Sequence, residues 1–113
     1  MRSSYKTEAT TKAARTDGKK LNRLGDSNIY YKLHDNRHGM GYIYMVNKER
    51  DREANITLDM VKSRNIVVGR PYSSLKPEVG LAPGEDKAVT YEARDIPYSV
   101  QLQLMVSTKR VNP

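Results

Sequence analysis

From Asn28 onward, the chain consists of short segments in which apolar and polar residues alternate. A two-residue period is typical of β-strands that bury one face and expose the other. Asparagine, glycine and proline separate the segments, and tight turns favour these residues. The pattern predicts strands at 28–34, 41–47, 55–60, 65–68, 87–93 and 98–107, with an irregular stretch at 71–84.

In three of these strands the alternation also predicts which side chains face the core. No helical pattern of comparable strength appears after residue 28. Short alternating strands separated by such turns are typical of an antiparallel β-sandwich, so the predicted fold class is all-β. The expected core residues are Ile29, Tyr31 and Leu33, then Ile56, Leu58 and Met60, then Val100, Leu102, Leu104 and Val106.

Residues 48–53, with the sequence KERDRE, form a dense cluster of charge between two predicted strands. We expect a solvated, ion-paired hairpin turn, because the arginines interleave with the acids and neutralise them. This interleaving argues against a calcium site, which needs several carboxylate oxygens close together. Across the hairpin, Tyr42, Tyr44 and Val46 are expected to pair with Ile56, Leu58 and Met60.

The composition excludes several kinds of site. The chain has 113 residues, which fits one small domain. It contains no cysteine, so disulfides, thiolate metal sites and cysteine nucleophiles are excluded. Its two histidines, His34 and His38, flank a predicted turn, and no third metal ligand stands out. We therefore predict no catalytic, cofactor-binding or metal-binding residue, and no apolar run reaches the ~20 residues of a membrane-spanning helix.

The formal net charge of +7 is concentrated at the N-terminus. Residues 1–23 hold seven basic and two acidic side chains, a net +5, and contain too few apolar residues to form a core alone. We predict an extended basic arm at 1–27 that is disordered when free, a sandwich domain at 28–108, and a C-terminal tail at 109–113. The basic side chains expected to bind a partner are Arg2, Lys6, Lys12, Arg15, Lys19, Lys20 and Arg23.

A basic extension on a nearly neutral fold is typical of proteins that dock on an acidic polymer or surface. Nucleic acid, anionic lipid and the acidic surface of a microtubule all meet this description. Exposed tyrosines beside lysine and arginine would also suit stacking on single-stranded nucleic acid. Half of the tyrosines alternate with core positions, however, so packing is the expected role of most of them.

The motif GYIY at 41–44 is followed by Asn47, by a strand containing Thr57, and by Asn65 and Gly69. A Pro-Gly turn then precedes the strand KAVTYEA, and the last alternating strand closes the series. This arrangement resembles the C2-like β-sandwich domain of calpain-type proteins. The resemblance implies a non-catalytic accessory sandwich, because the family's catalytic Cys, His and Asn lie on other domains. The acidic loop of the calpain sandwich is not evident here, which argues against a calcium response.

The leading hypothesis is a non-catalytic structural or binding module, with no cofactor and no small-molecule substrate. It would dock on an acidic assembly through its arm and its sandwich surface. The resemblance favours tubulin or ciliary proteins as the partner, and a cytoplasmic, cytoskeletal or ciliary location. The alternative is an RNA-binding component of a ribonucleoprotein that uses the same arm. An enzyme or a calcium sensor is a third class, and the basic, Ser/Thr-rich N-terminus leaves a mitochondrial location as an alternative.

Overall fold

The computed structural model describes the backbone of residues 6–12 and both backbone and side chains of residues 21–111. Within these residues every regular element is a β-strand. The strands are β1 (Lys6–Lys12), β2 (Asn22–Arg23), β3 (Ile29–Asp35), β4 (Met40–Asn47), β5 (Arg52–Asp59), β6 (Ile66–Val68), β7 (Glu78–Leu81), β8 (Asp86–Ala93) and β9 (Gln103–Arg110).

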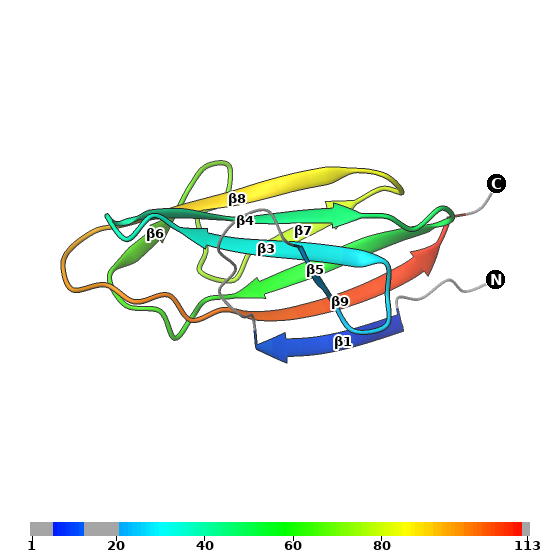
Figure 1. Cartoon of the computed structure of the whole chain (residues 1–113), viewed down its shortest axis with the longest axis horizontal. Coiled ribbons are helices and arrows are strands. Elements are labelled where there is room, and N and C mark those ends of the chain that lie inside the picture. The colour runs from blue at the N-terminus through cyan, green and yellow to red at the C-terminus, as the bar shows by residue number, and fades with distance from the viewer. Residues whose placement is uncertain (1–5, 13–20, 112–113) are drawn as a thin grey trace.

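The strands form two sheets that pack face to face. The first sheet has four strands in the order β1-β9-β5-β7, and the second has five in the order β2-β3-β4-β8-β6. Every pair of neighbours is antiparallel. In Figure 1, β3, β4 and β8 lie above β5 and β9, and β1 lies at the lower edge beside β9. The predicted all-β, antiparallel architecture is therefore confirmed for the described residues.

The core lies between the two sheets and contains most of the residues that the alternation predicted. Val100 is the exception, because it is only partly buried and packs against the edge of the core. Each large aliphatic side chain that is fully buried contributes roughly 1.5–3 kcal/mol to stability. The buried residues among those predicted are Ile29, Tyr31, Leu33, Ile56, Leu58, Met60, Leu102, Leu104 and Val106.

The predicted hairpin across residues 48–53 is wrong. Strand β4 pairs with β3 and β8, whereas β5 pairs with β7 and β9, so this connection carries the chain from one sheet to the other. The expected face of β4 is wrong as well, since its phase differs by one residue and such a shift reverses the face of every side chain in a strand. The inner row of β4 contains Ile43, Met45 and Asn47. The outer row contains Tyr42, Tyr44 and Val46, which were expected to pair with β5.

The acidic side chains of this connection form ion pairs and a hydrogen bond with neighbouring parts of the sheets. The carboxylate of Asp51 lies 3.5 Å from the guanidinium of Arg110, and that of Glu53 lies 3.1 Å from the ammonium of Lys109. Glu49 accepts a hydrogen bond from the backbone N–H of Asn28. The charged segment therefore ties the crossing point to β9 and to the start of β3.

A strand was missed inside the stretch at 71–84. Strand β7 pairs with β5 and buries Val79 and Leu81, which are at most 1% exposed. Its four residues alternate between exposed and buried, but the exposed position between Val79 and Leu81 is Gly80, which has no polar side chain to mark it. Prolines also lie close to both ends of the strand. A segment this short is too brief for alternation to separate it from a loop.

The described strands extend beyond the predicted limits of 28–108. Strand β1 pairs along β9, and Leu24, which follows β2, is fully buried in the core. The hydroxyl of Ser27 donates to the carbonyl of Leu24 and closes the turn that leads into β3. At the other end, β9 continues to Arg110. Parts of the predicted arm and tail thus belong to the sheets.

Gly41 of β4 gives the first testable prediction. A Cβ at this position would overlap the hydroxyl of Tyr91 and the carbonyl oxygen of His34. Gly41→Ala should therefore lower the free energy of unfolding by about 2 kcal/mol, as overpacking of a tight core does. Gly80→Ala is the control, because no atom lies within 4 Å of its added Cβ. Urea denaturation followed by circular dichroism measures both, and equal losses would contradict the prediction.

Candidate functional site

The outer surface of the five-stranded sheet carries three tyrosines, one histidine and two lysines close together. They alternate along β3 and β4 with the buried core residues, and the three tyrosines among them are half-buried. We call this surface the tyrosine face. Its residues are Tyr30, Lys32, His34, Tyr42, Tyr44 and Lys48.

Tyr42 lies at one end of the tyrosine face, next to the turn between β3 and β4. Its cross-strand partner on β3 is His34, and the two rings lie 5.2 Å apart between centroids with a tilt of 34°. The ammonium of Lys32 lies 5.9 Å from the centroid of the same tyrosine ring. Cations are attracted to the negative face of an aromatic ring at such distances. Tyr42 is therefore flanked by one aromatic ring and one positive charge.

A second aromatic and basic pair lies toward the far end of β4. The ammonium of Lys48 lies 4.9 Å from the centroid of the Tyr30 ring. Tyr30 pairs across the sheet with Val46, which is four residues from Tyr42 along β4. At about 3.3 Å per residue, the two tyrosines are separated by roughly 13 Å along the strand direction.

Tyr44 lies between these two pairs and is fixed by a carboxylate of β8. Its hydroxyl donates to Asp86 over 2.6 Å. This hydrogen bond, helped by partial burial and by the negative charge of Asp86, raises the pKa of the Tyr44 hydroxyl above its usual range. The phenol stays protonated, because the carboxylate stabilises the donor form. Tyr44 therefore contributes a neutral ring of fixed orientation.

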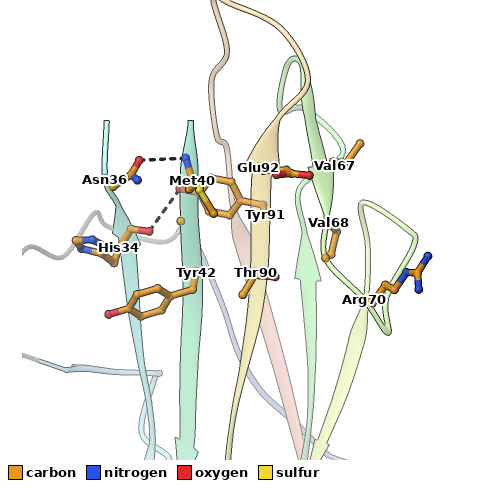
Figure 2. Close-up of a pocket in the computed structure, with 12 residues that line it drawn as sticks. His34, Asn36, Met40, Tyr42, Val67, Val68, Arg70, Thr90, Tyr91 and Glu92 are labelled. Carbon is orange, nitrogen blue, oxygen red and sulfur yellow. Dashed lines mark hydrogen bonds between the residues drawn. The ribbon is translucent and has the colours of Figure 1, made fainter. Parts of the chain in front are cut away.

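A groove of about 620 Å³ begins at Tyr42 and crosses the sheet toward β6. Two small residues line its floor. Thr90 is the cross-strand neighbour of Tyr42, and Gly69 lies next to Thr90, to whose carbonyl it donates its N–H. Figure 2 shows Tyr42 and His34 on one side of Thr90, with Val67, Val68 and Arg70 on the other. The groove thus adjoins the tyrosine face, with which it shares His34 and Tyr42.

The turn between β3 and β4 holds one end of this groove. Asp35 accepts hydrogen bonds from the hydroxyls of Tyr91, over 2.6 Å, and Tyr98, over 2.8 Å. Its carboxylate also accepts from the N–H of Arg37, which adopts a positive φ of 65°. Asn36 accepts from the N–H of Met40 in the same turn, as Figure 2 shows. These bonds fix the backbone that carries His34 and Met40.

The residues predicted to bind a partner are only partly described. Arg2, Arg15, Lys19 and Lys20 lie outside the described residues. The backbone of Lys6 and Lys12 forms the two ends of β1. Arg23 is the one member whose side chain is described, and its guanidinium donates to the backbone carbonyls of Ser27 and Asp26. Arg23 therefore stabilises the turn before β3.

The histidines and loop acids form no metal centre among residues 6–12 and 21–111, where no group of three or more potential ligands occurs. His34 contacts Tyr42, and His38 lies exposed in the turn after β3. In the same part of the chain, no helix is long and apolar enough to cross a membrane.

Sequence reasoning did not find the tyrosine face as a unit. Tyrosines beside lysines had indicated stacking on nucleic acid, but most were assigned to packing. Of the seven tyrosines within residues 21–111, Tyr31 and Tyr91 are buried, whereas the tyrosines of the face are not. The signal that could have found the face is the sequence Tyr30-Tyr31-Lys32, in which the residues beside a core tyrosine must point outward.

Comparisons with protein-family models, curated proteins and solved structures find no match to the chain. The calpain-type resemblance therefore stays a prediction that depends on the motifs described above.

Proposed function

We propose that the protein is a non-catalytic binding module that docks on an acidic macromolecule through the tyrosine face, assisted by its basic N-terminal arm. RNA in single-stranded form is the partner that fits this face best. The observation that carries the proposal is the placement of Lys32 beside Tyr42 and of Lys48 beside Tyr30.

Rings and ammonium groups together match the two chemical parts of a nucleic-acid strand. Bases stack on aromatic side chains, and phosphates attract lysine, so a flat sheet with both groups can follow a strand without reading its sequence. The flexible stem of Lys32 or Lys48 allows the ammonium to move from the ring to a phosphate when a base occupies the ring face. Tyr44, held by Asp86, adds a third ring between the two pairs.

The second candidate is an acidic protein assembly such as a microtubule or a ciliary structure. The observation in its favour is the charge of residues 1–23, with seven basic side chains against two acidic ones. The calpain-type resemblance points the same way and would place the protein at the cytoskeleton or cilium. An acidic protein surface, however, offers carboxylates to the lysines but no nucleobases on which the tyrosine rings could stack. We therefore rank it below RNA.

Salt dependence of RNA binding tests the proposal. Binding of a fluorescent single-stranded RNA, followed by anisotropy, should weaken steeply as the salt concentration increases. The logarithm of the association constant should fall against the logarithm of the salt concentration with a slope of about 0.7 for each phosphate contacted. The double variant Lys32→Gln/Lys48→Gln should reduce this slope by about 1.4, because two contacts are lost. Lys62→Gln, an exposed lysine outside the face, is the matched control and should leave the slope unchanged.

Co-sedimentation with microtubules at low salt is the competing measurement. If the protein pellets with microtubules and fails to bind RNA, the acidic assembly is the partner and RNA is excluded. The variant Arg15→Gln/Lys19→Gln/Lys20→Gln then reports on the arm alone, because it removes charge and leaves β1 in place. Loss of pelleting in that variant would assign the contact to the arm.

A further inference from the structure

One row of residues that crosses the groove from β4 to β6 has exposed side chains. Met40 is 57% exposed and Val67 is 37% exposed, although both are apolar. Between them in the sheet stands Glu92, whose cross-strand neighbours are Met40 on β4 and Val67 on β6. An exposed apolar pair on either side of a carboxylate is an arrangement that serves no packing purpose.

The two charges of this region are also available for a ligand. Neither Glu92 nor Arg70 forms an ion pair or a hydrogen bond through its side chain within residues 21–111. Figure 2 shows Glu92 beside Val67, and Arg70 farther along that side with its guanidinium turned away from Thr90. Both Glu92 and Arg70 line the groove. A carboxylate and a guanidinium at the border of one groove can bind a ligand that offers both donors and negative charge.

Guanine is the base whose edge suits a carboxylate. Its Watson–Crick edge presents the N1–H and the 2-amino group as adjacent donors, and an ionised carboxylate accepts hydrogen bonds with both oxygens. Adenine presents an acceptor at N1, which a carboxylate repels, and uracil offers a single donor on that edge. Met40 and Val67 would cover the faces of the purine, while Arg70 would take the adjoining phosphate.

We propose that the groove between Tyr42 and Arg70 selects a guanine base of a single-stranded RNA, with Glu92 as the residue that determines this preference. The inference rests on the proposed function, because the tyrosine face supplies the general affinity for the strand. Its volume of about 620 Å³ leaves room for a purine together with its ribose.

The test compares uridine oligomers that carry one central guanosine, adenosine, inosine or uridine. The protein should bind the guanosine oligomer about tenfold more tightly than the adenosine oligomer, at the lower end of the range for bidentate base contacts. Inosine lacks the 2-amino group and should lie between the two. Glu92→Gln should reduce the guanosine preference to about twofold or less, while affinity for the oligomer of uridine alone should not fall, because the substitution removes a negative charge that repels the phosphates.

The two proposals fail in distinguishable ways. Equal affinity for the four oligomers overturns the guanine preference and leaves the tyrosine face as a general RNA-binding surface. A preference that persists in Glu92→Gln overturns the assignment to Glu92. Absence of binding to every oligomer overturns the proposed function and this inference with it. Since Glu92 is exposed, its substitution should not affect folding, and circular dichroism checks this.

Discussion

Replacing Tyr42 or Tyr30 by alanine should weaken the binding of single-stranded RNA by about tenfold each, since stacking of one base on an aromatic ring contributes roughly 1–3 kcal/mol. The double variant should lose about a hundredfold, because sites more than roughly 7–10 Å apart are usually additive. The two rings are farther apart than this along the sheet. Fluorescence anisotropy at fixed salt measures all three affinities.

Phenylalanine at the same positions separates stacking from other roles of the tyrosines. Tyr42→Phe and Tyr30→Phe keep the ring and should retain most of the affinity. Met105→Ala is the control on the opposite surface, where this side chain of β9 is 43% exposed. If the phenylalanine variants bind as weakly as the alanine variants, the hydroxyls and not the ring faces bind the partner. If Met105→Ala loses as much affinity, the tyrosine face is not the binding surface.

The strands with one apolar and one polar row could be predicted from the sequence. In β5, Ile56 and Leu58 alternate with Asn55 and Thr57, so only one phase buries apolar groups. The last predicted strand is similar, with Gln103 between the core residues Leu102 and Leu104. In such strands the hydrophobic effect alone selects the face, and no knowledge of neighbouring strands is needed.

Strand β4 could not be assigned a phase in this way, and the tyrosine face was missed with it. Both of its rows are apolar or aromatic, since Ile43 and Met45 alternate with Tyr42 and Tyr44. The inner row also ends in Asn47, a polar residue where alternation would expect an apolar one. Only the pairing with β3 and β8 determines which row is inside. That pairing depends on contacts distant in sequence, which a local pattern does not contain.

The buried Asn47 joins the two sheets at the point where the chain crosses between them. It lies at the end of β4 and is fully buried. Its amide nitrogen donates to the carbonyls of Arg52, over 2.9 Å, and Leu81, over 3.1 Å, on the opposite sheet. Its amide oxygen accepts from the N–H of Glu49 over 2.9 Å. One side chain therefore satisfies three backbone groups from β5, β7 and the crossing connection.

Asn47→Ala should lower the free energy of unfolding by about 3 kcal/mol, because each buried polar group that loses its partner costs roughly 1–3 kcal/mol. This is a large share of the roughly 5–15 kcal/mol that stabilises a small domain. Urea denaturation followed by circular dichroism gives the value. An unchanged slope of the unfolding free energy against urea concentration would show that the native state is still compact. The control is Asn55→Ala, whose amide makes one partly exposed hydrogen bond to Glu78 over 3.2 Å. That variant should lose no more than about 0.5 kcal/mol. Equal losses in the two variants would mean that the sheets are held together by the apolar core alone and that Asn47 does not link them.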